Sequence, residues 1–207
     1  MEELRGRTEI LWRRKFFLRD RNAPVEKIIP AREECLRLMK QHGMLENIVD
    51  HSIEVANVAL YLSTELNKKG QRIDLRLVEA ASLLHDLTKT DSFKTREDHA
   101  WTGARLLKEI GYEDVGAVVA QHIWLSRDVD PLLVSEEEVV NYADKRVMHD
   151  RIVSLEERFK DLRDRYGKDQ KGMDYLGRME MVIKEIENKI FLILQINPHD
   201  LQNLPRK

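Results

Sequence analysis

A histidine and an aspartate stand side by side in an otherwise apolar run, residues 80–89, which reads AASLLHDLTK. This pair, His85-Asp86, constrains the fold more than any other feature, because the run has the composition of a buried helix. Two ionisable groups are buried together only when a partner charge or a metal ion offsets their lost hydration. The rest of the chain must therefore bring such a partner to His85 and Asp86.

Candidate partners occur in order along the chain on both sides of this pair. His51 precedes it, and His99, His122 and Asp144 follow it, so four of the seven histidines belong to one series. Imidazole nitrogens and carboxylate oxygens together suit borderline to hard divalent ions. The sequence therefore predicts a metal centre with six ligands: His51, His85, Asp86, His99, His122 and Asp144.

Helical periodicity dominates the sequence from Pro30 onward, and no segment alternates convincingly with a period of two. We predict an all-α fold, a helical bundle in which inward-facing side chains from several helices converge on one point. Asp74 and Ser135 are expected to cap helices. The expected helices cover approximately residues 31–41, 45–68, 74–89, 95–110, 113–124, 135 to beyond 151, and 173–195.

Three regions are expected along the chain. Residues 1–23 form an arm rich in basic and aromatic residues, which is interpreted either as a surface for nucleic acid or membrane or as a helix that docks on the domain or on a second subunit. Residues 24–165 form the main helical domain. Residues 166–207 form a helical extension with one apolar face, which packs on the domain or on a partner subunit, and a homodimer through this helix is one hypothesis.

The composition limits the cellular compartments and the classes of binding partner that the chain suits. The single cysteine, Cys35, excludes an internal disulfide and a cysteine-rich zinc site, and it suits a reducing compartment. A net charge of −2 gives no general attraction to nucleic acid or to anionic membranes. No apolar span is long enough to cross a membrane. We therefore expect a cytoplasmic protein with neither nucleic acid nor a membrane as its partner.

The segments around the candidate ligands resemble those of the HD superfamily of metal-dependent phosphohydrolases. The resemblance rests on His51 in DHSIEVA, on the His85-Asp86 dyad in LHDLTK, and on Asp144 in YADK. It covers about residues 44 to 150 and implies that the main domain is an HD domain with these four residues as primary metal ligands. His99 and His122 match the two extra histidines of the branch with a dinuclear centre, in which Asp86 would bridge the ions.

Within the superfamily, the segments DHAWTGA and QH, at His99 and His122, are most similar to those of bacterial hydrolases that split dinucleoside tetraphosphates. The resemblance implies hydrolysis of a phosphoester or phosphoanhydride of a nucleotide-type substrate by a metal-activated water. It implies two divalent ions, iron or manganese first, with zinc, nickel, cobalt or magnesium as alternatives. Asp86 and Lys89 are the expected catalytic residues, and Lys89, Lys145 and Arg146 are the expected substrate-binding residues.

Two alternatives remain open on the same residues. Some HD proteins with six ligands hold a di-iron centre and cleave bonds with oxygen, and the ligands alone hardly distinguish such an oxygenase from a hydrolase. A nucleotide-sensing binding module is the other alternative. The segment from Met148 to Phe159 resembles a less characterised group of HD proteins rather than the dinucleotide hydrolases, which leaves the substrate open.

Overall fold

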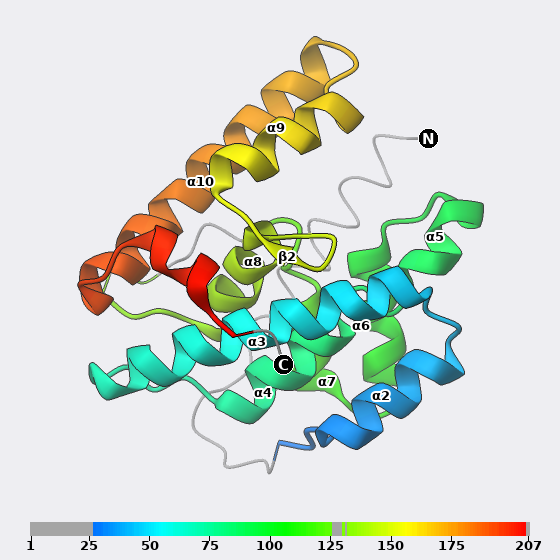
Figure 1. Ribbon diagram of the computed structural model, residues 1–207. Coiled ribbons are helices and arrows are strands. Elements are labelled where there is room, and N and C mark those ends of the chain that lie inside the picture. The colour runs from blue at the N-terminus through cyan, green and yellow to red at the C-terminus, as the bar shows by residue number, and fades with distance from the viewer. Residues whose placement is uncertain (1–26, 126–129, 131, 206–207) are drawn as a thin grey trace.

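The computed structural model describes residues 27–125, 130 and 132–205 (Figure 1). The arm predicted at residues 1–23 lies outside the described residues. Within them the protein is built from α-helices, and the only sheet is a hairpin of two strands of two residues each. The predicted all-α fold is therefore confirmed.

The helices and strands follow one another in this order: α2 (Arg32–Gln41), α3 (Glu46–Lys68), α4 (Leu75–Leu84), α5 (Lys89–Thr95), α6 (His99–Glu109), α7 (Glu113–Val119), α8 (Glu136–Arg146), β1 (Val147–Met148), β2 (Arg151–Ile152), α9 (Leu155–Tyr166), α10 (Gln170–Leu194) and the 3₁₀ helix η1 (Pro198–Asn203).

The long helix α3 lies at the centre of the helical body. It packs against α4 and α8, while α7 packs against α4 and α6. Val55, Ala59 and Leu62 of α3 are completely buried in the core between these helices. The helices α9 and α10 run side by side as a hairpin that extends beyond the rest of the described chain (Figure 1). The core therefore surrounds α3, and the helices next to it bring the candidate ligands together.

The apolar face of α10 is covered by the same chain. Its buried residues, which include Ile183, Ile186 and Ile190, face α3, α8 and α9. Of the two arrangements expected for the extension, the structure shows packing on the domain.

Local capping signals in the sequence are confirmed. The Asp74 side chain accepts hydrogen bonds from the backbone N–H groups of Arg76 and Leu77 at the start of α4. Ser135 and Glu138 form a capping box at the start of α8. These caps satisfy donors that the first turn of a helix leaves free, which is why nearby side chains alone are enough to predict them.

Several predicted helices end earlier than their apolar pattern indicates. The run 74–89 is broken, because α4 ends at Leu84 and α5 begins at Lys89, so His85 and Asp86 lie in the turn between them. Likewise α7 ends at Val119, and His122 follows it in a turn. In the first turn the backbone N–H of Leu87 bonds to Leu84, and in the second the N–H of His122 bonds to Val119. Such bonds to the third residue back tighten the chain as a helix ends.

Two other helix boundaries are corrected. The helix expected from residue 95 begins at His99, because Arg96 adopts a left-handed conformation that ends α5 and Asp98 caps α6. The helix expected to continue past Arg151 ends at Arg146, where the β1–β2 hairpin begins. The Arg146 side chain holds this bend, because its Nε donates to the Val153 carbonyl at 2.7 Å.

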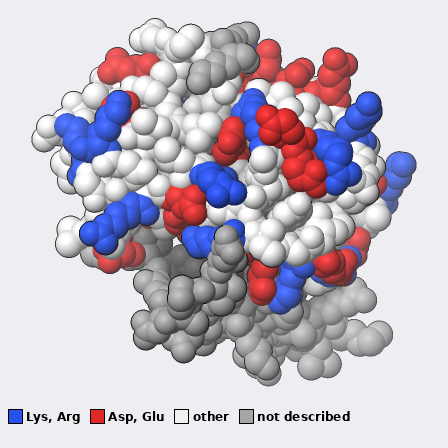
Figure 2. All heavy atoms as spheres, turned by 90° about the horizontal axis from the view of Figure 1, so that it is seen from below, with Lys and Arg blue, Asp and Glu red and all other residues white. Residues whose placement is uncertain are grey.

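Charge is mixed over the surface. On the face shown in Figure 2, Lys and Arg lie among Asp and Glu with uncharged surface between them, and they do not gather into one basic patch of described residues. None of the described helices is both long enough and apolar enough to cross a membrane.

Candidate metal centre

His85 and His122 reach the centre from the ends of two neighbouring helices, α4 and α7, and both are held in the same way. The Nδ1 of His85 donates to the Ser82 carbonyl at 2.7 Å, and the Nδ1 of His122 donates to the Val119 carbonyl at 2.7 Å. Each bond runs to the residue three positions back. It fixes the ring and leaves the Nε2 lone pair directed at the centre.

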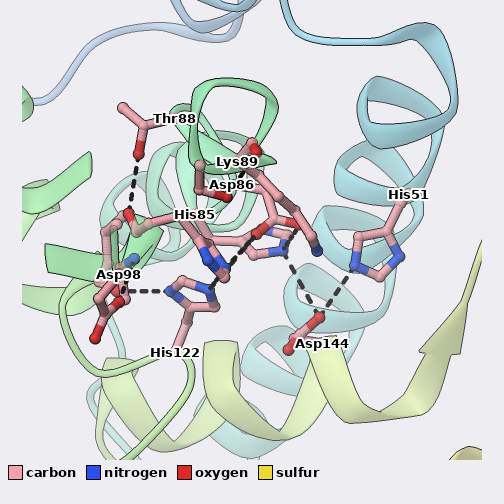
Figure 3. A network of polar contacts seen from close by, with 12 residues as sticks. His51, His85, Asp86, Thr88, Lys89, Asp98, His122 and Asp144 are labelled. Atoms are coloured by element: carbon pink, nitrogen blue, oxygen red, sulfur yellow. Dashed lines mark hydrogen bonds and ion pairs between the residues drawn. The ribbon is translucent and has the colours of Figure 1, made fainter. Parts of the chain in front are cut away.

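His51 comes from α3, and its ring is held by a residue far away in the sequence. Its Nδ1 lies 2.9 Å from the backbone carbonyl of His149, in the turn of the β1–β2 hairpin. Its Nε2 lies 3.0 Å from Asp144 Oδ1 (Figure 3). His51, His85 and His122 therefore all bind a backbone carbonyl through Nδ1. This arrangement is typical of metal-ligating histidines, whose outer nitrogen is tied to a hydrogen-bond acceptor.

Asp144 lies on α8 beside the buried Lys145. The Nζ of Lys145 is 2.5 Å from Asp144 Oδ2 and 3.1 Å from the carbonyl of His122. The lysine therefore holds one oxygen of Asp144 and joins α8 to the turn that carries His122. The other oxygen of Asp144 faces His51 and, at 3.7 Å, the Nε2 of His85.

His99 is placed by the start of α6. The Asp98 side chain accepts from the backbone N–H groups of Ala100 and Trp101, which fixes His99 as the first residue of the helix. The hydroxyl of Thr88 donates to the His99 carbonyl at 3.0 Å and ties the start of α6 to the turn after the dyad.

Close packing of α6 and α7 brings His122 beside His99. A Cβ at Gly116 of α7 would lie only 2.7 Å from the Ala104 carbonyl of α6, so the two helices approach closely only because position 116 has no side chain. The Nε2 atoms of His99 and His122 are 3.3 Å apart.

The six predicted ligands converge as two groups of three. His51, His85 and Asp144 form one group, and Asp86, His99 and His122 form the other; within each group the candidate ligand atoms lie within 4.8 Å of one another. Asp86 faces both groups. Its Oδ1 is 3.1 Å from His99 Nε2, while its Oδ2 is 3.4 Å from His85 Nε2.

Burial and charge set the protonation of the carboxylates and of His122. Burial raises the pKa of Asp86, but the charges of His85 and Lys89 outweigh it and hold that pKa well below its usual value. The pKa of Asp144 is also held well below its usual value, because Lys145, His51 and His85 outweigh the effect of burial. Burial lowers the pKa of His122 to about 4. Two ionised carboxylates and a neutral imidazole are the forms that bind metal ions.

The pKa of His85 is shifted in the opposite direction from that of His122. Burial lowers its pKa, but the negative charges of Asp86 and Asp144 raise it by more, so the pKa lies above its usual value. The two carboxylates therefore favour the charged form of His85.

The donors of these residues fit a divalent cation. Among the described residues, the buried atoms without a hydrogen-bond partner include His85 Nε2 and Asp86 Oδ1, one from each group of three. A cation would coordinate both atoms in place of the hydrogen bond that each of them lacks, and it would compete with a proton for His85. The set holds nitrogen and oxygen donors without cysteine, as expected for a hard or borderline ion.

The three predicted substrate-binding residues lie in different places. The Nζ of Lys89 is 2.6 Å from Asp86 Oδ2, and its side chain is 31% exposed, so Lys89 lies where the centre meets solvent. Lys145 is next to the centre but buried, with its ammonium bound to Asp144 and His122.

The prediction that Arg146 binds substrate is corrected, because its side chain is buried and not available to a substrate. It is buried and bonded to Tyr142, Val153 and Pro198 on the side of α8 that faces α10 and η1. Residues 144 and 146 are two positions apart on a helix and point in different directions. Arg146 therefore stabilises the hairpin and the C-terminal segment.

His149 is the residue at the centre that the sequence does not reveal. It lies in a charged stretch and does not belong to the series of candidate ligands. It contributes a backbone carbonyl, and no residue type signals where a carbonyl will point.

A comparison with known protein families and curated proteins agrees with this geometry. A family model described as the HD domain matches residues 48–166. An uncharacterised protein of Methanocaldococcus jannaschii, MJ0778, is 27% identical over 170 residues, which cover 75% of this chain and 96% of that protein. No solved structure gives a significant match.

Two further relatives have names that concern RNA. The tRNA (cytidine(56)-2′-O)-methyltransferase of Picrophilus torridus is 33% identical over 156 residues, 68% of this chain and 42% of the relative. The ribonuclease Y of Rubrobacter xylanophilus is 29% identical over 133 residues, 63% of this chain and 24% of the relative. The matched region thus spans less than half of each of these two relatives.

Proposed function

Because the chain belongs to the HD domain family, we propose that it is a metal-dependent phosphohydrolase that cleaves a phosphoester or phosphoanhydride bond of a nucleotide-type substrate. The observation that carries the proposal is the pair of three-residue ligand groups that meet at Asp86. The buried atoms His85 Nε2 and Asp86 Oδ1 support it, since neither has a hydrogen-bond partner among the described residues and both are donors that a metal ion could coordinate.

Each group of three would hold one divalent ion, iron or manganese in the first place, and the two oxygens of Asp86 face His85 of one group and His99 of the other. Bound divalent ions lower the pKa of water and polarise phosphoryl oxygens. The protein's own residues supply the rest. The carbonyls of Ser82, Val119 and His149 orient the imidazoles, and Lys145 fixes one oxygen of Asp144. His85 and Lys89 lower the pKa of Asp86, and Lys89 presents a cation where the centre meets solvent.

RNA is a second candidate substrate. It is favoured by one observation, the names of the relatives, which include a tRNA methyltransferase and a ribonuclease. On the face shown in Figure 2 the described Lys and Arg are mixed with Asp and Glu, so this face favours a nucleotide or a short chain end over a long nucleic acid.

Metal content per chain is the first test. We expect about two ions per chain in protein purified without chelator or a metal-binding tag, and about one in the His99→Ala variant. His199→Ala is the matched control, because His199 is exposed and belongs to neither group of candidate ligands. If neither protein binds metal after incubation with Mn²⁺ and Fe²⁺, the proposal is wrong.

Hydrolysis is the second part of the same test. The metal-loaded protein would be given nucleotides, dinucleoside polyphosphates and short RNA, with and without oxygen. Release of phosphate or a nucleotide without oxygen supports a hydrolase. Turnover that consumes oxygen would favour the di-iron oxygenase, and metal binding with no turnover would favour a sensing module.

A further inference from the structure

The turn that carries His122 is held from outside by α8. Since α7 ends at Val119, the carbonyls of Gln121 and His122 lie beyond that helix and need donors from elsewhere. Two side chains of α8 supply them. Asn141 Nδ2 donates to the Gln121 carbonyl at 2.7 Å, and Lys145 Nζ donates to the His122 carbonyl at 3.1 Å. These two side chains are four positions apart and therefore neighbours on the helix, so α8 binds the turn at two consecutive carbonyls.

Asn141 and Lys145 differ in what else they contact. Lys145 also binds Asp144, a candidate ligand of the other group of three, so its loss would disturb both groups. Among the described residues, the Asn141 side chain makes one hydrogen bond, and it goes to the Gln121 carbonyl. Asn141 therefore acts on the turn alone.

Burial of the Asn141 amide is costly. The residue is 1% exposed, and its Oδ1 is buried without a hydrogen-bond partner among the described residues. A buried acceptor without a donor lowers stability, and a leucine, whose side chain branches at the same position, would not carry this cost. What the amide adds over an apolar side chain is the bond from Nδ2 to the turn.

The position of this turn decides where the Nε2 of His122 lies. The ring is tied through Nδ1 to the Val119 carbonyl at 2.7 Å, so the ring moves with the backbone around it. Its Nε2 lies 3.3 Å from His99 Nε2 and 3.6 Å from Asp86 Oδ1. Because metal binding needs its ligands in a narrow range of positions, a shift of the turn would weaken binding by this group.

We infer that Asn141 is a positioning residue for one of the two candidate ions. By holding the Gln121 carbonyl, it fixes His122 and selectively strengthens the binding of a divalent ion by the group that contains His122. The inference rests on the proposed function and extends it, because it assigns the two groups separate supports. None of the ligand motifs includes Asn141, so only the packing of α8 against the turn reveals it.

The test measures Mn²⁺ binding to metal-free protein by calorimetry in two backgrounds. His99→Ala leaves the group of Asp144 complete, and His51→Ala leaves the group of His122 complete. In the His51→Ala background we expect Asn141→Leu to raise the Kd about tenfold, since loss of an outer contact that orients a metal-ligating histidine typically weakens binding by about this much. In the His99→Ala background, the same substitution should change the Kd less than twofold.

Two further variants separate positioning from general stability. Asn141→Ala, which cannot overpack the core, should give the same pattern as Asn141→Leu. Asn67→Ala is the control, because the Asn67 side chain bonds the N–H and the carbonyl of Ile73 at 2.8 and 2.9 Å and belongs to neither group. Asn67→Ala should lower the urea midpoint of metal-free protein and yet change the Kd less than twofold in both backgrounds.

Three results would overturn the inference: equal changes of the Kd in the two backgrounds, changes below twofold in both, or an equal effect of Asn67→Ala. Absence of Mn²⁺ binding in the His51→Ala background would also overturn it, even if the parent hydrolyses a substrate. Conversely, site-selective weakening by Asn141→Leu in a protein that hydrolyses nothing would uphold the inference while the proposed function fails.

Discussion

Lys89 and Lys145 each contact a ligand carboxylate, but they do so in different surroundings. The Lys145 side chain is 5% exposed and its ammonium has two acceptors, Asp144 and the carbonyl of His122. The Lys89 side chain is 31% exposed and contacts Asp86. Water can partly replace Lys89 but not Lys145. We therefore assign Lys145 to positioning Asp144, and Lys89 to the side of the centre that a substrate reaches.

This difference predicts unequal effects on stability. In metal-free protein, Lys145→Met should lower the free energy of unfolding by about 3 kcal/mol, because it leaves a buried carboxylate without its cation. Lys89→Met should lower it by about 1 kcal/mol, because a partly exposed pair is screened by water. Urea unfolding in the presence of chelator measures both values. Equal losses of unfolding free energy in the two variants would show that the difference in exposure between Lys89 and Lys145 does not affect how much each lysine stabilises the protein.

At the scale of elements, the β1–β2 hairpin replaces the continuation of α8 and thereby completes the centre. Val147 pairs with Ile152 and Met148 with Arg151, which leaves His149 in the turn with φ of 58°. In this left-handed conformation its carbonyl meets His51 Nδ1. Such a conformation is unfavourable for β-branched residues and tolerated by asparagine.

The backbone conformation at His149 can therefore be tested with two substitutions that both remove the imidazole. We expect His149→Val to weaken Mn²⁺ binding about tenfold, since loss of an outer contact to a metal-ligating histidine typically has effects of about this size. His149→Asn should bind Mn²⁺ within about twofold of the parent. Calorimetric titration of metal-free protein measures both affinities. If both variants lose affinity equally, the imidazole and its contact with Arg165 matter rather than the backbone.

At the scale of the whole molecule, the candidate ligands come from segments that are far apart in the sequence. His51 and Asp144 are 93 residues apart, yet their side chains lie within 3.0 Å. The unfolded chain cannot hold these groups together, so a bound ion stabilises only the folded protein. Folding and metal binding should therefore be coupled.

Removal of metal should accordingly lower the melting temperature. An ion present at about a hundred times its Kd contributes about 2.7 kcal/mol, which corresponds to roughly 5–10 °C for a chain of this size. Thermal unfolding before and after dialysis against chelator, with Mn²⁺ restored afterwards, measures the shift. The control is His51→Ala combined with His99→Ala, which removes one ligand from each group and should abolish the response. A parent that melts at the same temperature with and without metal would contradict the coupling.

The sequence by itself determined the all-α class, the capping of α4 by Asp74 and of α8 by Ser135, and the six residues that the structure brings together. These features depend on local properties: helical periodicity, side chains close to their own helix ends, and residue types that favour a shared cation over separate burial. Whether the six residues bind metal remains a prediction.

Only the tertiary structure decided where the helices end and which cations reach the centre. The apolar patterns around His85 and His122 continue past the observed ends of α4 and α7, and nothing local marks the bend after Arg146. His149 acts through a backbone carbonyl, which no residue type records. Lys145 and Arg146 are adjacent in the sequence, yet Lys145 holds the candidate ligand Asp144 and Arg146 holds the hairpin. Neighbouring residues of a helix point in different directions, and segments far away in the sequence determine which groups each side chain contacts.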